Sequence, residues 1–228
     1  MQKILKEMNI AANTAEFDKY SEMLLKTNEV MNLTAITDPE EVKVRHFADS
    51  LSLLSCYDFS DKKVIDVGCG AGFPGLPLKL GDKSIKLTLL DSLAKRIDFL
   101  SDVCETLGVP DVECIHARAE EKALEEGYRE SYDIAVSRAV ADLSMLAELT
   151  LPYVKVGGVF LAMKASDCEE ELDRAKNAIK TLGGEVKEIK EYTLPTTDIT
   201  HKVIIIEKTT ETPEKYPRRF AKIKSRPL

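Results

Sequence analysis

A glycine-rich segment that follows a short apolar run constrains the fold of this chain most strongly. The run Lys63–Val67 predicts a strand, and four glycines follow it between Gly68 and Gly75. Glycine is needed where the backbone turns sharply or lies close to a ligand. A plain turn between a strand and a helix needs one glycine, so four indicate a ligand-binding loop. In an open α/β sheet, ligands bind at the carboxyl ends of the strands, where this loop would lie.

Strand-like runs alternate with amphipathic helices along most of the remaining chain. The clearest helix carries apolar residues at spacings of four and three from Leu93 to Leu107, and Gly108 ends it. A later helix is predicted to begin at Ser166. We predict strands over Lys63–Val67, Ile85–Leu90, Val112–His116, Tyr132–Ser137, Gly158–Met163, Val186–Tyr192 and Lys202–Glu207, the last two antiparallel. This alternation predicts an α/β, doubly wound, Rossmann-like fold with a mainly parallel seven-stranded sheet.

The first quarter of the chain differs from the rest because it has a helical pattern throughout. We therefore expect a helical N-terminal extension over residues 1–60, packed on a sheet domain over residues 61–212. The segment Asp38–Glu41 marks a helix start, with an acidic capping residue followed by proline. Arg45 and Asp49 are four residues apart on this helix, so we expect them to pair on its surface.

The C-terminal segment, residues 213–228, differs in charge from the rest of the chain. The whole chain carries a formal net charge of −7, which argues weakly against a nucleic-acid partner. The segment itself holds one acid and six bases, which are Lys215, Arg218, Arg219, Lys222, Lys224 and Arg226. Such an asymmetry can steer a polyanion toward the protein, or the segment can be a disordered solubilising end. Composition leaves both readings open.

Several classes of protein are disfavoured by what the sequence lacks. No apolar run reaches the roughly 18 residues that span a bilayer, and charges interrupt the N-terminal region where a secretory signal would be apolar. We therefore expect a cytoplasmic protein with no membrane partner. The five cysteines include no C-x-x-C pair and the three histidines lie far apart, so we expect reduced thiols and no metal site.

Two ligands compete for the glycine loop. Gly70–Gly75 matches the dinucleotide pattern G-x-G-x-x-G, and Asp91 follows Gly70 by 21 residues, as the acid that binds an NAD ribose does. Asp66, however, stands two residues before Gly68, where its carboxylate would repel a phosphate and attract a cationic sulfonium. D-x-G-x-G-x-G is the pattern of methyltransferases that bind S-adenosylmethionine (SAM). In such an enzyme, Asp91 would bind the ribose hydroxyls of SAM. Asp91 can also cap the following helix. The cofactor-binding candidates are Asp66, Gly68, Gly70, Gly72 and Asp91.

Five motifs spread over nearly the whole chain resemble one family. They are Asn32–Ile36, Arg45–Leu51, Asp66–Gly75, Ser137–Ala139 and Tyr216–Arg219. Together they resemble the RsmG (GidB) family of bacterial 16S ribosomal RNA guanine-N7 methyltransferases. The glycine loop alone would indicate only the wider superfamily of Rossmann-like SAM-dependent methyltransferases, whereas the combination of motifs is specific.

The resemblance implies SAM as the cofactor. Gly68 and Phe73 would line its pocket, and Ala119 and Glu120 would lie on its adenine side. Arg138 corresponds to a further cofactor-site position at the carboxyl end of a strand. Taken alone, Glu120 could instead be a solvated helix start, and Arg138 could be a surface ion-pair partner.

The resemblance also implies the substrate, which is N7 of a guanine in a loop of 16S ribosomal RNA (the 530-loop region). The partner would be 16S rRNA or the 30S subunit or its precursor, and the enzyme would act as a monomer. N7 carries a lone pair and no proton, so its methylation needs positioning and desolvation rather than a general base. The turn Ser137–Val140 lacks the Asn/Asp-Pro-Pro-aromatic pattern of amino-methylating enzymes. The residues themselves leave ring-nitrogen, hydroxyl and small-molecule methylation open.

No catalytic side chain can be assigned from the sequence. The candidates are Arg138, Lys164 and His46, and a histidine in such a setting is structural as often as catalytic. Basic residues must hold RNA phosphates, and arginine recognises them better than lysine. The RNA-binding candidates are Arg45, Arg118, Lys164, Arg218 and Arg219, whereas Lys95 and Arg96 are expected on a solvated helix face.

Three other functions remain open on the sequence alone. A SAM-binding or RNA-binding module without turnover is disfavoured by the intact glycine loop with Asp66, Asp91 and Arg138. A small-molecule methyltransferase is disfavoured by the basic C-terminal segment and the helical N-terminal extension. An NAD-linked oxidoreductase is disfavoured by Asp66 and by the lack of a Tyr-x-x-x-Lys pair for proton transfer.

Overall fold

The computed structural model describes residues 1–138 and 141–228. Ala139 and Val140, which belong to the predicted Ser137–Ala139 motif and Ser137–Val140 turn, lie outside the described residues. The strands are β1 Lys63–Val67, β2 Lys86–Asp91, β3 Val112–His116, β4 Tyr132–Arg138, β5 Val154–Ala165, β6 Gly184–Thr193 and β7 Thr200–Lys208. The α-helices are α1 Gln2–Glu7, α2 Thr14–Met31, α3 Pro39–Val42, α4 Asp49–Leu51, α5 Leu53–Cys56, α6 Gly75–Gly81, α7 Ala94–Leu107, α8 Ala119–Lys122, α9 Leu143–Thr150, α10 Glu169–Thr181 and α11 Phe220–Ser225. A π-helix, η1, covers Lys43–Ala48, and a 3₁₀-helix, η2, covers Leu151–Tyr153.

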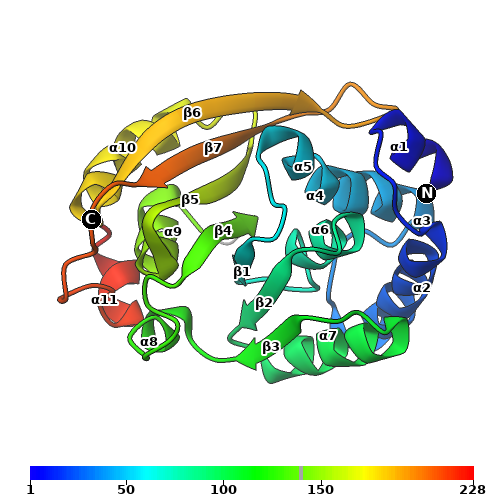
Figure 1. The fold of residues 1–228 in the computed structure, drawn as a ribbon, viewed down its shortest axis with the longest axis horizontal. Coiled ribbons are helices and arrows are strands. Elements are labelled where there is room, and N and C mark those ends of the chain that lie inside the picture. Colours follow the sequence, from blue (N-terminus) through cyan, green and yellow to red (C-terminus); the bar gives the residue numbers. More distant parts are fainter. Residues whose placement is uncertain (139–140) are drawn as a thin grey trace.

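Within the described residues, seven strands form one sheet in the order β3-β2-β1-β4-β5-β7-β6. The first five in that order are parallel, and β7 runs antiparallel to both of its neighbours. The predicted doubly wound sheet and its antiparallel last pair are therefore confirmed. The strand order reverses at β1, between β2 and β4, which creates the crevice where such sheets bind ligands. Helices cover both faces (Figure 1).

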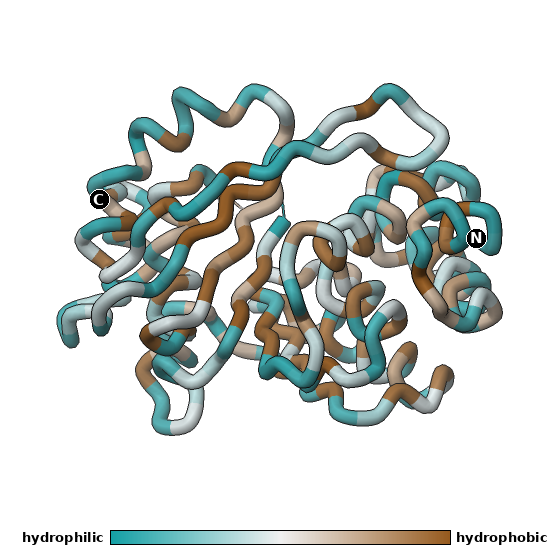
Figure 2. Tube along the Cα trace, turned by 45° about the horizontal axis from the view of Figure 1, so that its top comes forward, coloured by the Kyte–Doolittle hydropathy of each residue, from teal (hydrophilic) through white to brown (hydrophobic). Residues whose placement is uncertain are grey.

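The inner strands of the sheet are mostly apolar because both of their faces are buried, whereas the edge strands β3 and β6 carry many exposed or partly exposed residues. Successive side chains point to opposite faces, so Val64 and Leu89 enter one hydrophobic cluster while Ile65 and Leu90 enter the other. Figure 2 shows this apolar character concentrated in the strands. In the part of the chain that is described, no helix is both long and apolar enough to cross a membrane.

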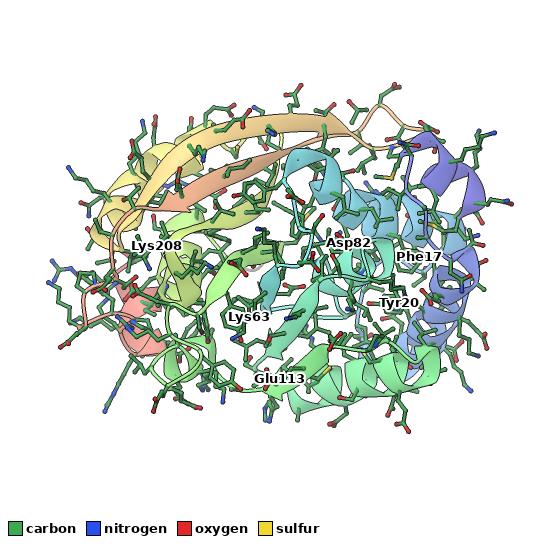
Figure 3. The ribbon with its side chains drawn as sticks, in the orientation of Figure 1. Phe17, Tyr20, Lys63, Asp82, Glu113 and Lys208 are labelled. Atoms are coloured by element: carbon green, nitrogen blue, oxygen red, sulfur yellow. The ribbon has the colours of Figure 1, made fainter. Side chains whose placement is uncertain are left out.

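The N-terminal helices share one core with the sheet. Phe17 and Tyr20 of α2 are fully buried and belong to the same hydrophobic cluster as Val64 and Val136 of β1 and β4. Figure 3 shows both aromatic side chains on the inner side of α2. The predicted helix start is confirmed, because the Asp38 side chain accepts hydrogen bonds from the first turn of α3.

Two local predictions about helices are wrong. Asp49 does not pair with Arg45 on the surface, because its side chain is 3% exposed and binds Arg138, a partner from β4 in the sheet. The helix before β6 begins at Glu169 and not at Ser166. Three consecutive glutamates occupy its first turn, where negative charge interacts favourably with the helix dipole.

The C-terminal segment is packed against the sheet domain, so its interpretation as a disordered end is wrong. Tyr216 and Ile223 are buried. The side chain of Arg129 donates hydrogen bonds to the carbonyl oxygens of Thr212 (2.7 Å) and Tyr216 (2.9 Å). Apolar anchors spaced among the bases were too sparse to form a visible periodic pattern.

Arg218 makes the strongest of these attachments. Its backbone N and Nε lie 2.9 and 2.8 Å from Oε1 of Glu148 in α9, and its Nη2 lies 2.5 Å from Oε2. The Glu148 side chain is fully buried and that of Arg218 is 13% exposed. A carboxylate buried in this way requires its partner, because an uncompensated charge in the interior is costly.

We expect Arg218→Ala to lower the free energy of unfolding by about 3 kcal/mol, since it leaves Glu148 buried without its partner. Arg219→Ala is the matched control, because Arg219 is exposed and surface substitutions change stability by about 0.5 kcal/mol or less. Urea unfolding of the two variants measures the difference. Equal losses would contradict the assigned role of Arg218.

Candidate functional site

A cavity of about 510 Å³ opens at the carboxyl ends of β1, β2 and β4. This volume is in the range of small-molecule and cofactor sites. Seven of the predicted cofactor residues line it, namely Gly68, Gly70, Phe73, Asp91, Ala119, Glu120 and Arg138. Asp66 and Gly72 are outside the lining, and His46 and Arg118 from the other predicted sets are inside it.

The glycine loop is folded as its sequence requires. Gly68, Gly70 and Gly72 all have positive φ angles of 74°, 59° and 101°, a region that residues with a Cβ rarely adopt. At Gly72, a Cβ would also lie 2.6 Å from Cδ2 of Leu100. Gly72 therefore acts from behind the loop, by allowing α7 to pack against it, while Gly68 and Gly70 face the cavity.

Asp66 supports the loop from inside the protein. Its carboxylate is fully buried, and Oδ2 accepts a hydrogen bond from the backbone N of Gly75 (2.7 Å) at the first residue of α6. Oδ1 has no hydrogen-bond partner among the described residues. Burial raises the pKa of Asp66 to about 7, despite the opposing hydrogen bond from Gly75. The sequence pattern predicts a carboxylate that faces the ligand, whereas in the structure it lies behind the cavity wall.

Asp91 fixes the opposite edge of the same loop. Its Oδ2 accepts hydrogen bonds from the backbone N of Gly70 (3.0 Å) and from Nη1 of Arg96 (3.2 Å). Its Oδ1 accepts from the backbone N of Leu93 (2.9 Å), just before α7. Asp91 thus holds the glycine loop and the start of α7 while lining the cavity. Arg96 lines the cavity too and is paired, so its prediction as a solvated residue is wrong.

A second wall comes from the loop after β3 and from the C-terminal half of the chain. Ala119 and Glu120 begin α8, and the Glu120 side chain is 7% exposed. Arg118 beside it is 58% exposed, with its Nη1 4.0 Å from Oε1 of Glu120. Leu149 of α9 and Phe220 of α11 complete this wall. The wall therefore combines a buried carboxylate with apolar side chains.

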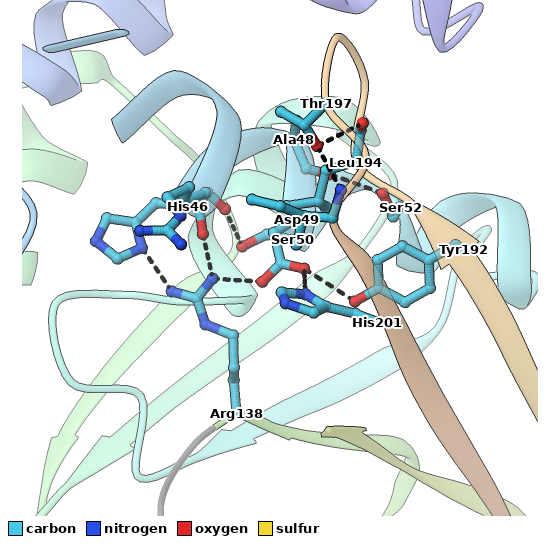
Figure 4. Close-up of polar contacts among 12 residues, drawn as sticks. His46, Ala48, Asp49, Ser50, Ser52, Arg138, Tyr192, Leu194, Thr197 and His201 are labelled. Atoms are coloured by element: carbon cyan, nitrogen blue, oxygen red, sulfur yellow. Dashed lines mark hydrogen bonds and ion pairs between the residues drawn. The ribbon is translucent and has the colours of Figure 1, made fainter. Parts of the chain in front are cut away.

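Arg138, at the end of β4, is held by a buried network that joins distant parts of the chain (Figure 4). Its Nη1 lies 2.8 Å from Oδ2 of Asp49 and 3.1 Å from the backbone oxygen of Arg45. The other oxygen of Asp49 accepts hydrogen bonds from Tyr192 Oη (2.9 Å) and His201 Nδ1 (2.8 Å). Burial raises the pKa of Asp49, but the hydrogen bond from His201 and the charge of Arg138 outweigh it, so the net pKa is lowered. The charge of Arg138 thus has a fixed position at the cavity.

His46 is held as a neutral ring. Nη2 of Arg138 lies 3.0 Å from Nδ1 of His46. Arginine only donates, so Nδ1 must carry the lone pair. The proton then sits on Nε2, which lies 2.7 Å from Oγ1 of Thr34. Burial, together with the charge of Arg138, lowers the pKa of His46 to about 4. His46 is therefore unable to carry a positive charge near neutral pH.

Phe73 stands in the middle of an aromatic stack beside the cavity. His46 stacks on it with ring centroids 4.4 Å apart, and Tyr20 stacks with a centroid distance of 5.6 Å. The guanidinium carbon of Arg138 lies 5.0 Å from the Phe73 ring centroid. Tyr20 also donates a hydrogen bond to the backbone oxygen of Ala71 in the loop. The stack joins α2, η1 and the glycine loop into one rigid wall.

The remaining predicted residues lie outside the cavity lining. Lys164 is 9% exposed and binds Glu171 Oε1 (2.7 Å), and Arg218 binds Glu148. Arg45 and Arg219 are exposed. The structure brings together His46 and Arg138, whereas Lys164 is tied to α10.

Several residues of the site cannot be identified from the sequence alone. Asp49 and Thr34 belong to two of the family motifs, but the local pattern does not reveal their partners. Asp49 binds Arg138 of β4, and Thr34 binds His46 of η1. Nothing in the sequence marks Leu149 and Phe220 as cavity residues, because an apolar side chain in a helix usually belongs to the hydrophobic core. In the part of the chain that is described, no group of three His, Cys, Asp or Glu side chains is arranged to hold a metal ion.

Comparisons with known proteins identify the family. The family model for GidB, described as rRNA small subunit methyltransferase G, matches residues 13–200. A protein of Alkaliphilus metalliredigens named ribosomal RNA small subunit methyltransferase G is 53% identical over 92% of this chain and 88% of its own length. A Bacillus cereus protein of the same name is 47% identical over 96% of this chain and 93% of its own. The chain belongs to the GidB family.

Solved structures share its fold. A SAM-dependent methyltransferase from Aquifex aeolicus aligns with a TM-score of 0.56 and 16% identity, over 77% of this chain and 96% of its own. TYW2 of M. jannaschii, solved in complex with AdoMet, aligns with a TM-score of 0.54 and 15% identity, over 70% and 76% of the two chains. The fold is therefore the Rossmann-like methyltransferase fold predicted from the sequence.

The buried carboxyl of Asp66 gives the stability of the protein a pH dependence. Its pKa is raised from 3.8 to about 7 in the folded state, so folding favours the protonated form. The free energy of unfolding should therefore fall as the pH rises from about 4 to about 7, by roughly 4 kcal/mol from this group. Asp66→Asn has no titrating group at this position, so its free energy of unfolding should lack this part of the pH dependence.

Chemical denaturation of both proteins across this pH range measures the effect. Asp61→Asn, at an exposed position, is the matched control for removing one carboxylate. Parallel stability profiles for wild type and Asp66→Asn would contradict the buried-carboxyl account.

Proposed function

We propose that this chain binds SAM in the cavity and transfers its methyl group to N7 of a guanine in 16S ribosomal RNA. The observation that carries the proposal is the set of side chains gathered around the glycine loop in a chain of the GidB family. Asp91, Glu120 and Arg138 are separated along the sequence, yet all three line one cavity.

The lining residues fit the chemical groups of SAM. Asp91, already oriented by Gly70 and Arg96, would accept hydrogen bonds from the ribose hydroxyls. The buried carboxylate of Glu120 would accept a hydrogen bond from the adenine amino group. Arg138 would bind the carboxylate of the amino-acid end, because its guanidinium is fixed in place and Arg138 lines the cavity. Asp66 would act as a positioning residue for the loop.

The choice of SAM over a dinucleotide rests on the family to which the chain belongs. Asp91 does not distinguish the two ligands, because an acid at this position also binds the ribose of NAD. Asp66 does not distinguish them either, because its carboxylate lies behind the cavity wall.

The residues around the cavity suit a transfer without acid–base catalysis. When bound, SAM supplies a methyl group on a cationic sulfur, which the lone pair of guanine N7 can accept with no proton to remove. His46 is neutral and hydrogen-bonded at both ring nitrogens, so its ring presents a flat surface and not a proton donor. Phe73 and His46 exclude water from one side of the cavity. Catalysis by this chain therefore rests on positioning and desolvation.

The RNA would be held at the rim of the cavity. Guanine N7 is accessible in loops and unstacked bases rather than inside an A-form helix. Arg118 lines the rim and is 58% exposed, so it can reach a phosphate. Arg45 and Arg219 are exposed as well and remain candidates. The substrate would be naked 16S rRNA or the 30S subunit in the cytoplasm, and the enzyme would act as a monomer.

The test is transfer of tritium from methyl-labelled SAM to 30S particles and to naked 16S rRNA from a strain that lacks this gene. After nucleoside digestion, we expect the label in 7-methylguanosine. Asp91→Ala should lose at least about tenfold in SAM affinity, because the ribose loses its acceptor and the loop its support.

The outcomes separate the competing functions. SAM binding without transfer to either substrate would favour a small-molecule methyltransferase or a binding module. Failure of the wild type to bind SAM would refute the proposal and reopen the dinucleotide interpretation.

A further inference from the structure

The C-terminal segment, residues 213–228, has two sides with different chemistry. On its inner side, Phe220 lines the same cavity as Leu149, Ala119 and Glu120, and α9, which carries Leu149, packs against both α8 and α11. Contacts between α11 and α9 keep it there. Figure 1 shows α11 beside α8 and α9, away from the helices of the N-terminal extension. Phe220 is thus an aromatic ring on the side of the cavity assigned to adenine.

The beginning of the segment is fixed, whereas α11 depends on a few apolar contacts. Arg218 is bound to the buried Glu148, one residue before the cavity residue Leu149. From there on, Ile223 is fully buried and Phe220 partly so. A helix of six residues is too short to be stable alone in water, so packing must hold it. Any ligand that covers Phe220 would add to that packing.

The outer side of the segment is strongly basic. Its exposed bases are Lys215, Arg219, Lys222, Lys224 and Arg226. None of these five forms an ion pair within residues 1–138 and 141–228. Cations without internal partners in one short segment form a surface that suits a polyanion, because they can neutralise phosphates and release counterions.

We propose that the C-terminal segment couples cofactor binding to RNA binding. Phe220 packs against the adenine of SAM, and the exposed bases of the same segment hold RNA phosphates. Each ligand then stabilises the position of α11 that the other needs, so each increases the affinity for the other. This inference rests on the proposed function, and it makes Phe220 a SAM-binding residue that also positions the RNA-binding bases of its segment.

Thermodynamics requires the coupling to be reciprocal. If S-adenosylhomocysteine tightens RNA binding by a given factor, RNA must tighten S-adenosylhomocysteine binding by the same factor.

Deletion of residues 213–228 would be a poor test of RNA binding, because the segment contributes to both binding sites. Truncation would remove the bases and one wall of the cofactor cavity together.

The experiment measures two affinities in the full-length protein. Calorimetry gives the affinity for S-adenosylhomocysteine, and filter binding to naked 16S rRNA at several salt concentrations gives the affinity for RNA with and without that ligand. In the wild type, we expect saturating S-adenosylhomocysteine to tighten RNA binding about fivefold or more. Phe220→Ala should weaken S-adenosylhomocysteine about tenfold, as loss of base stacking does, and abolish the coupling.

Two matched variants separate the sides of the segment. Phe220→Tyr keeps the ring and should restore both affinity and coupling. Lys222→Gln combined with Lys224→Gln should weaken RNA binding and flatten its salt dependence, while the affinity for S-adenosylhomocysteine without RNA stays at the wild-type value. Thermal unfolding confirms that each variant is folded.

The results distinguish this inference from the proposed function. The coupling is overturned if the wild type binds both ligands independently, or if Phe220→Ala binds S-adenosylhomocysteine as tightly as the wild type. A wild type that binds neither ligand would instead overturn the proposed function, and the coupling with it.

Discussion

The ion pair between Asp49 and Arg138 is the interaction on which the site depends. Asp49 lies on a helix of the N-terminal extension, and Arg138 ends the central strand β4. A carboxylate this deeply buried is stable only if its lone pairs are satisfied, and Tyr192 and His201 supply the other two donors. The pair therefore ties the N-terminal helices to three strands of the sheet. It also leaves one guanidinium in a fixed position at the cavity.

The cavity is assembled from both ends of the chain around an α/β centre. The centre provides the glycine loop and Asp91, as the fold requires at its switch point. The N-terminal extension provides Thr34 and His46, and the C-terminal segment provides Phe220. The two ends are thus part of the site and not appendages. The α/β centre is the fold shared with distant methyltransferases, whereas the N- and C-terminal segments add further residues to the lining of the cavity.

Much of the fold was predictable from the sequence, because periodicity and glycine placement report local geometry. The alternation of side chains along a strand, however, predicts only which face of the sheet a residue lies on. It does not predict the atoms that its side chain contacts. The pattern therefore could not show that the carboxylate of Asp66 contacts the backbone of Gly75 rather than the ligand. Asp49 was misjudged because its partners are 89 and 152 residues away. The composition of the basic C-terminal segment was compatible with a disordered, solvent-exposed end, because its buried apolar residues are too few to form a periodic pattern. Such contacts become visible only when distant segments meet.

A crystal structure of the protein with S-adenosylhomocysteine would test the account most directly. It should show the adenine between Glu120 and Phe220, the ribose hydroxyls on Asp91 and the amino-acid carboxylate on Arg138, with the bond between Asp49 and Arg138 intact. A ligand bound outside this cavity, or one whose carboxylate lies away from Arg138, would contradict it.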